Sequence, residues 1–389
     1  MLSRSKVAVL AVTAGLLTAC GGGTEPTEPA ASSTPHGYVE GAEETAEAQS
    51  KLLLADAESG AVRVLDLLSE EVTELDDVQG VGGISTDGRF GFLTAGDTTT
   101  VVDTGSWMVD HGDHVHYYRA EIRKAGELDG NTIAAHSDSA ITATPLSNGT
   151  TALLDTEALA DGETKLDDPV AGIAVPYAQH LVVASEDQVE VRDRKGGSAA
   201  EIDESCAEPK GSAVTGRGAV LGCADGALLV HEEDERFAAT KIPYPRSVSA
   251  TERAAEFAQR PGSETLAATA GGRGFWALNT TEREWTFVAE RQVVAVNAVG
   301  AGGPLLALTS DGVLHAYDPA TGEQTASREL LSEGVPDGAS PTIQVDTSRA
   351  YVNDAAGSKV YEIDYTDELR VARTFDLDIK PSYLVETGR

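Results

Sequence analysis

One short unit recurs along most of the chain: an apolar strand, a turn of Asp, Gly, Ser or Asn, and a second strand that ends in a polar residue. Each unit predicts a β-hairpin, because β-forming residues flank a turn whose backbone favours glycine or asparagine. Eight such units follow one another at intervals of about 42 residues. They are Leu52–Leu67, Phe90–Gly105, Ala140–Thr156, Leu181–Arg194, Ala219–Glu233, Leu266–Thr280, Leu305–Pro319 and Ala350–Asp364.

A period of this length around a central hairpin is typical of the four-stranded blade of a β-propeller. We label the strands of a blade a to d from the axis outward, so each recurring hairpin supplies strands b and c. The segment Val170–Tyr177 then predicts a strand a, and Val72–Val78 predicts a strand d. We therefore predict an all-β chain folded as a propeller of eight four-stranded blades. Seven blades is the alternative count, because the boundaries between blades are weakly marked.

The C-terminal segment Pro381–Arg389 is expected to supply strand a of the first blade. It would pair beside Lys51–Ala55 and close the ring, which removes the exposed sheet edges of an open array. An α/β fold is not expected, because nothing between the predicted strands has the pattern of an amphipathic crossover helix.

The N-terminal residues have the pattern of an export signal. Arg4 and Lys6 precede the apolar run Val7–Leu17, which is too short to span a bilayer. The sequence LTAC, which ends at Cys20, resembles the lipobox of bacterial lipoproteins, in which the cysteine is lipidated. A plain signal peptide with an incidental cysteine is the alternative. We predict that residues 1–19 are removed and that lipidated Cys20 anchors the protein to the outer face of the cytoplasmic membrane.

The composition separates a linker from the predicted propeller. Residues 20–50 are small and polar, so they predict a flexible linker before the propeller at residues 51–389. The chain has 29 basic and 63 acidic residues and a formal net charge of −34. This charge excludes nucleic acid as a partner, because phosphate binding needs cationic surface. It suits an exported protein, which we expect to be a monomer held at the membrane by its lipid alone.

Two further cysteines, Cys206 and Cys223, lie within the predicted propeller. In an exported protein, a pair at this spacing predicts a disulfide. A zinc site built on these cysteines is the alternative.

Three of the eight histidines fall within six residues: His111, His114 and His116. Asp110 and Asp113 lie among them. The motif follows strand c of the second blade, so we expect it in the c–d connection, leading into a strand d from Tyr117 to Leu128. In an extended segment His114 and His116 point the same way, because side chains alternate along a strand.

A fourth imidazole follows from the strand order. His136 ends the predicted strand a of the third blade, and a–b and c–d connections share one face of a propeller. Zinc prefers three or four imidazole or carboxylate ligands, and Cu²⁺ or Ni²⁺ would be accepted less selectively. We therefore predict a Zn²⁺ site on this face. Its candidate ligands are His111, His114, His116, His136 and Asp113.

The sequence DHGDHVHYY at residues 110–118, the later His136 and the hairpin sequence CADG from Cys223 resemble the AztD family of bacterial zinc metallochaperones. The resemblance implies an extracytoplasmic β-propeller that binds zinc and passes it to the solute-binding protein of a zinc ABC importer. It also implies zinc binding by the four histidines, with Asp113 as a possible ligand, and a Cys206–Cys223 disulfide. The lipobox departs from the family, whose Gram-negative periplasmic members would be freely soluble.

Two other classes of function remain open. A zinc hydrolase would keep three protein ligands and an open metal position, with Asp110 or Asp113 as the base. Against an enzyme, the chain has no Ser nucleophile elbow and no Gly-rich phosphate loop, and aromatic residues make up only 5%. A scaffold that binds proteins without metal is the other alternative. We predict a carrier and no enzymatic activity, with the zinc hydrolase as the runner-up.

Overall fold

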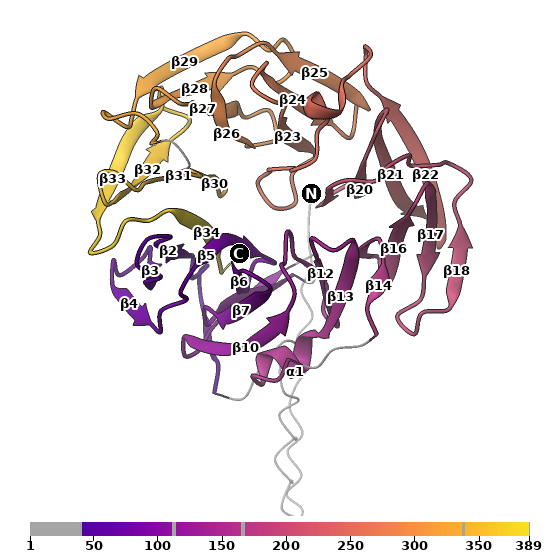
Figure 1. Ribbon diagram of the computed structural model, residues 1–389, viewed down its shortest axis with the longest axis horizontal. Coiled ribbons are helices and arrows are strands. Elements are labelled where there is room, and N and C mark those ends of the chain that lie inside the picture. The colour runs from indigo at the N-terminus through magenta and orange to yellow at the C-terminus, as the bar shows by residue number, and fades with distance from the viewer. Residues whose placement is uncertain (1–40, 111–113, 165–167, 337–338, 389) are drawn as a thin grey trace, which may run out of the picture. The chain divides into compact units, whose positions relative to one another are not determined.

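The computed structural model describes residues 41–110, 114–164, 168–336 and 339–388. Within them, eight antiparallel sheets follow one another around a ring, each with its outermost strand at the rim (Figure 1). The chain is therefore a β-propeller with eight blades, as the period of the hairpins predicts.

The first four blades have four strands each, ordered below from the axis to the rim. The first blade has β34 (Tyr383–Thr387), β2 (Lys51–Ala55), β3 (Val62–Asp66) and β4 (Val72–Leu75). The second has β5 (Val81–Thr86), β6 (Phe90–Ala95), β7 (Thr98–Asp103) and β10 (Arg123–Asp129). The third has β11 (His136–Ser137), β12 (Ile141–Pro145), β13 (Thr150–Asp155) and β14 (Val170–Ala171). The fourth has β15 (Ile173–Tyr177), β16 (His180–Ser185), β17 (Gln188–Arg192) and β18 (Ser198–Glu201).

The remaining blades repeat this order, with one shortened sheet. The fifth has β19 (Ser212–Thr215), β20 (Gly218–Cys223), β21 (Gly226–Glu233) and β22 (Arg236–Pro243). The sixth has β23 (Thr265–Thr269), β24 (Phe275–Asn279) and β25 (Glu284–Val288), and a single bridge from Ala258 to Ala267 replaces its strand a. The seventh has β26 (Val293–Ala298), β27 (Leu305–Thr309), β28 (Val313–Tyr317) and β29 (Gln324–Glu329). The eighth has β30 (Ile343–Val345), β31 (Ala350–Asp354), β32 (Lys359–Asp364) and β33 (Arg370–Asp376).

The ring closes between the two ends of the propeller. β34 pairs antiparallel with β2, in a register that runs from Lys51 opposite Thr387 to Ala55 opposite Tyr383. This is the closure predicted from the C-terminal segment, and it pairs the inner edge of β2.

The core consists of apolar clusters between neighbouring blades. Leu52 and Leu54 pack against Tyr351 of the eighth blade, whereas Leu53 packs against Leu93 of the second. Successive side chains of a strand point to opposite faces of the sheet, so one buried strand supplies two cores. The same arrangement holds at each junction around the ring. It explains why the central strands are almost continuously apolar.

The prediction of one strand a over Val170–Tyr177 was wrong in its boundaries. The segment is divided at Gly172 into β14, the outer strand of the third blade, and β15, the inner strand of the fourth. Gly172 has φ of +88°, and a Cβ there would collide with the carbonyl oxygen of Ala184. Glycine therefore permits the turn between the two blades.

Helical structure is short in the described residues. It comprises α1 (Thr156–Ala160) and the 3₁₀ helix η1 (Ala250–Glu252). No described helix has the length and apolar character needed to cross a membrane.

Candidate metal centre

The c–d connection of the second blade leaves the blade and forms a hairpin of its own. β8 (Ser106–Asp110) and β9 (Val115–Arg119) pair antiparallel, with Val109 opposite His116. The histidine motif therefore lies in the connection that the strand order predicts. The prediction of a strand d beginning at Tyr117 was wrong, however, because β10 begins at Arg123 and the residues before it belong to the hairpin or follow it.

Local backbone geometry at the base forces the chain out of the blade. Gly105 has φ of +67°, and its carbonyl oxygen accepts a hydrogen bond from the Ala120 amide at 2.8 Å. A Cβ at this position would collide with the carbonyl oxygen of Ala120. The two arms of the hairpin can approach this closely only because residue 105 has no side chain.

Stacked side chains fix the hairpin to the blade. The rings of Trp107 and Tyr118 stack with centroids 5.5 Å apart, and the Arg89 guanidinium lies 3.7 Å from the Trp107 ring centroid. Arg89 also pairs with the buried Asp103 at 2.8 Å, at the end of β7. Tyr118 is fully buried, and this burial, followed by the nearby Glu44 charge, raises the pKa of its hydroxyl. The base of the hairpin is therefore a rigid aromatic and cationic stack.

A third strand completes a small sheet with the hairpin. β1 (Glu43–Thr45) pairs antiparallel with β9, and Glu43 forms an ion pair with Arg119 at 2.8 Å. These three residues lie in the segment for which the sequence predicts a linker. They form a strand because β9 offers a free backbone edge and a complementary charge.

Two histidines of the motif lie side by side on this sheet. The ring centroids of His114 and His116 are 4.9 Å apart in an edge-on arrangement, as expected from alternation along a strand. The Nδ1 atom of His116 lies 2.7 Å from the Glu44 Oε1 atom. An ionised carboxylate only accepts hydrogen bonds, so in this contact the Nδ1 atom of His116 donates and the Glu44 carboxylate orients the imidazole ring.

Sequence reasoning did not identify Glu44 as part of the site. The acidic run in which it lies is visible in the sequence, but Glu44 is separated from His116 by 72 residues. Only the pairing of β1 with β9 brings the two side chains together, and no local pattern indicates that pairing.

His136 lies apart from the hairpin, on the innermost strand of the third blade. Its Nε2 atom is 2.9 Å from the hydroxyl oxygen of Ser212, on the innermost strand β19 of the fifth blade. The ring keeps some accessible surface, but burial lowers the pKa of His136 to about 4. At neutral pH it is therefore an uncharged imidazole whose Nε2 atom is already within hydrogen-bond distance of Ser212.

The structure thus brings together two of the predicted ligands. His111 and Asp113 lie outside the described residues. Among the residues that are described, no group of three or more His, Cys, Asp and Glu side chains is arranged to hold a metal ion. The described part of the centre is the pair of His114 and His116 with Glu44 beside it.

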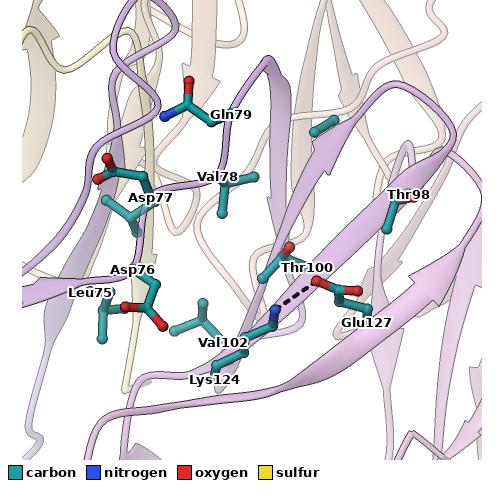
Figure 2. A pocket seen from close by; sticks show the side chains of 12 residues that line it. Leu75, Asp76, Asp77, Val78, Gln79, Thr98, Thr100, Val102, Lys124 and Glu127 are labelled. Carbon is teal, nitrogen blue, oxygen red and sulfur yellow. Dashed lines mark hydrogen bonds and ion pairs between the residues drawn. The ribbon is translucent and has the colours of Figure 1, made fainter.

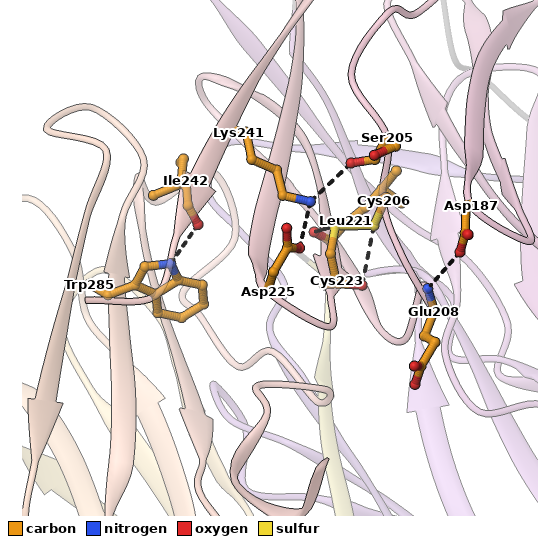
Figure 3. Close-up of a disulfide and its surroundings, with 11 residues drawn as sticks. Asp187, Ser205, Cys206, Glu208, Leu221, Cys223, Asp225, Lys241, Ile242 and Trp285 are labelled. Atoms are coloured by element: carbon orange, nitrogen blue, oxygen red, sulfur yellow. Dashed lines mark hydrogen bonds and ion pairs between the residues drawn. A yellow bond between two sulfur atoms is a disulfide. The ribbon is translucent and has the colours of Figure 1, made fainter. Parts of the chain in front are cut away.

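The two cysteines of the propeller form a disulfide (Figure 3). Cys206 precedes β19 and Cys223 ends β20, and both are buried. Lys241 on β22 holds the same corner, since its ammonium group lies 2.9 Å from the Ser205 carbonyl oxygen and 2.7 Å from Asp225. The alternative of a zinc site on these cysteines is therefore excluded. Cys20 lies outside the described residues.

The fold and this hairpin define the chain as an eight-bladed β-propeller with a histidine-bearing insertion in its second blade. Among solved structures it is similar to AztD from Citrobacter koseri, with 21% identity, a TM-score of 0.71, and coverage of 88% of this chain and 98% of that one. Apo AztD from the same organism gives 20% identity, coverage of 87% and 98%, and a TM-score of 0.71. The computationally designed Ika8 protein is less similar, at 13% identity, coverage of 79% and 91%, and a TM-score of 0.52.

At this level of identity the similarity concerns the fold, and the chain has an AztD-like propeller fold. No protein-family model matches the chain, and no curated protein matches it.

Proposed function

We propose that this protein is an extracytoplasmic zinc metallochaperone, anchored as a lipoprotein, that passes Zn²⁺ to the solute-binding protein of a zinc ABC importer. The single observation that carries the proposal is the pair of imidazoles of His114 and His116, 4.9 Å apart, beside a carboxylate that orients one of them. The AztD-like fold supports the same function, together with the resemblance of the histidine motif to that family.

Further zinc ligands are proposed in addition to His114 and His116. His111 and Asp113 precede it in the sequence and would supply an imidazole and a carboxylate, both of which zinc accepts. His136 is the remaining candidate. It would bind the metal through Nδ1, or through Nε2 after that atom gives up its contact with Ser212.

The position of the pair suits a carrier, which must release its metal as well as bind it. The base of the hairpin is held by the Trp107–Tyr118 stack, whereas the His116 side chain is 27% exposed and Glu44 is 48% exposed. A partner can therefore approach the ligands without unfolding a blade. Cys20, as the predicted lipid anchor, would keep the protein near a membrane-bound importer.

Metal analysis of the mature protein tests the proposal. We expect about one equivalent of zinc after purification without added ion. The variant His114→Ala/His116→Ala should lose it, because a tetrahedral site deprived of two ligands no longer competes with water. His180→Ala is the matched control, since His180 is a half-buried histidine at the start of β16 whose Nδ1 atom lies 2.8 Å from the Ala178 carbonyl oxygen. Unchanged zinc content in the double variant would place the site elsewhere.

A second measurement separates a carrier from the zinc hydrolase. The zinc-loaded protein is mixed with the importer's solute-binding protein, and metal transfer is followed beside hydrolysis of generic ester and phosphate substrates. We expect transfer without hydrolysis. Hydrolysis that depends on His114 and His116 would favour the enzyme instead.

A further inference from the structure

Arg89 lies at the base of the histidine hairpin and is not itself a candidate metal ligand. It belongs to the turn between β5 and β6, and two hydrogen bonds hold the backbone of that turn. The Thr104 hydroxyl donates to the Arg89 carbonyl oxygen at 2.8 Å, and the Gly388 amide donates to the Gly88 carbonyl oxygen at 2.7 Å. Gly388 directly follows the ring-closing strand β34. Closure of the ring therefore helps to fix the backbone that carries Arg89.

The Arg89 side chain joins a buried carboxylate to an indole ring. Its Nε and Nη2 atoms lie 3.3 Å and 2.8 Å from the Oδ1 and Oδ2 atoms of Asp103, and its guanidinium carbon lies 3.7 Å from the Trp107 ring centroid. A guanidinium is planar, so its edge can pair with a carboxylate while its face stacks on a ring. A lysine ammonium is a point charge that lacks this plane. Only arginine can therefore make both contacts with this geometry.

A row of stacked rings continues from Trp107 to the imidazole pair. We call Trp107, Tyr118 and His116 the aromatic row. The first two rings are inclined by 22°, and the His116 and Tyr118 rings are inclined by 21° with centroids 6.3 Å apart. The row follows from the strand pairing, because Trp107 lies opposite Tyr118 and His116 lies two residues before Tyr118 on the same face of β9. Packed rings restrict one another, so the orientation of Trp107 limits that of His116.

Another ion pair of the second blade shows what this connection adds. Lys124 and Glu127 on β10 pair at 2.6 Å, beside a cavity between the first and second blades (Figure 2). Their side chains are 47% and 56% exposed, and an exposed pair contributes little to stability. None of the described residues that line the cavity belongs to β8 or β9. The pair of Arg89 and Asp103 differs because its guanidinium also contacts a ring of the hairpin.

We propose that Arg89 is a positioning residue of the zinc site: through the aromatic row it fixes the orientation of the His116 imidazole and connects that orientation to closure of the ring. This inference rests on the proposed function. Glu44 holds the same imidazole at its Nδ1 edge, whereas the aromatic row holds its face. A ligand whose orientation is fixed before the metal arrives binds more tightly, because less freedom is lost on binding.

Arg89→Lys in the mature full chain tests the proposal, because it keeps the charge and removes the planar stack. We expect zinc affinity, measured by competition with a chelator, to fall by about tenfold. The absorption spectrum of bound Co²⁺ should change, since it reports coordination geometry. Amide hydrogen exchange of β8 and β9 should be faster in the metal-free variant. Arg246→Lys is the matched control, because Arg246 also pairs with a buried carboxylate, Glu252, and lies over an indole ring, Trp276.

A double variant tests whether Arg89 acts through Trp107. Arg89→Lys/Trp107→Leu should bind zinc no more weakly than the weaker of the two single variants, because both substitutions break the same contact. Additive losses, or an Arg89→Lys protein with the zinc affinity and Co²⁺ spectrum of the wild type, would overturn this inference while leaving the proposed function intact. A wild-type protein that binds neither zinc nor Co²⁺ would overturn the proposed function, and this inference with it.

Discussion

The connection between strands c and d differs between the second and fifth blades. In the fifth blade, strands c and d continue together to the end of the hairpin, and the ladder runs from Gly226 opposite Pro243 to Glu233 opposite Arg236. The turn residues Asp234 and Glu235 both have positive φ, which matches the twist of the strands. In the second blade the ladder stops at Asp103, and the chain leaves the sheet at Gly105.

Both regions carry histidine, but on different kinds of backbone. His231 stays within the ladder of the fifth blade, opposite Ala238. His114 and His116 lie on a separate hairpin, where a third strand brings Glu44 to them. The hairpin of the second blade thus gathers two imidazoles and a carboxylate on one small sheet, whereas the ladder of the fifth blade holds a single histidine.

Removing the disulfide of the fifth blade should have the largest effect on stability. Cys206→Ala/Cys223→Ala opens a loop whose ends are 17 residues apart, and we expect a loss of about 3 kcal/mol in the free energy of unfolding. Denaturant unfolding under oxidising conditions measures it, and the wild-type protein with reductant is the matched comparison. Zinc content should not change, because the hairpin lies on another blade. A loss of zinc would show that the two blades are not independent.

Gly105→Ala should disturb the hairpin that the fifth blade lacks. The new Cβ meets the Ala120 carbonyl oxygen at positive φ, and we expect a cost of about 2–3 kcal/mol together with weaker zinc binding. Gly96→Ala is the control, since Gly96 also has positive φ in the second blade but has open space around it. Its cost should be about 1 kcal/mol, with zinc binding intact. If the two substitutions changed zinc affinity equally, zinc binding would not depend on the geometry at the base of the hairpin.

Acidic pH should lower the free energy of unfolding, because His136 is buried as a neutral imidazole. The unfolded chain protonates this histidine near pH 6.5, whereas burial lowers the pKa to about 4 in the folded protein. Between these values the unfolded state binds more protons, so stability falls as the pH falls. We expect a contribution of about 2 kcal/mol across this window in the metal-free protein. Unfolding at pH 7 and pH 4.5 measures it, and His136→Gln should flatten the dependence while His180→Gln leaves it unchanged. A profile that is the same in His136→Gln would assign the acid sensitivity to other groups.

Glu44→Gln tests β1, the strand that brings a carboxylate to the hairpin of the second blade and has no counterpart in the fifth. We expect this effect to be the smallest. The amide orients His116 less firmly, and we expect zinc affinity to fall by about tenfold with little change in folding. Competition with a chromophoric chelator measures the affinity. Glu43→Gln is the adjacent control, because Glu43 pairs with Arg119 instead of a histidine. Equal affinities of the two variants would mean that Glu44 does not orient a metal ligand.

Much of the candidate site could be anticipated from local pattern. The placement of the motif between strands c and d follows from the repeat, and the common direction of His114 and His116 follows from their spacing. The contact of Glu44 with His116 could not be anticipated, nor could the contact of His136 with Ser212. Both join residues more than 70 positions apart, and such contacts depend on how separate strands meet.

The propeller and its closing strand follow from the amino-acid sequence alone, because each depends on a period or pairing that is visible along the chain. The sequence predicted the disulfide, and the structure decided between it and a zinc site on the same cysteines. The hairpin, its third strand and the cavity between the first two blades arise only when the chain packs. A repeat specifies how a strand faces its neighbours, since alternation is local. It does not specify where the chain leaves the repeat or which distant segment then fills the edge, because those outcomes depend on packing between parts far apart in the sequence.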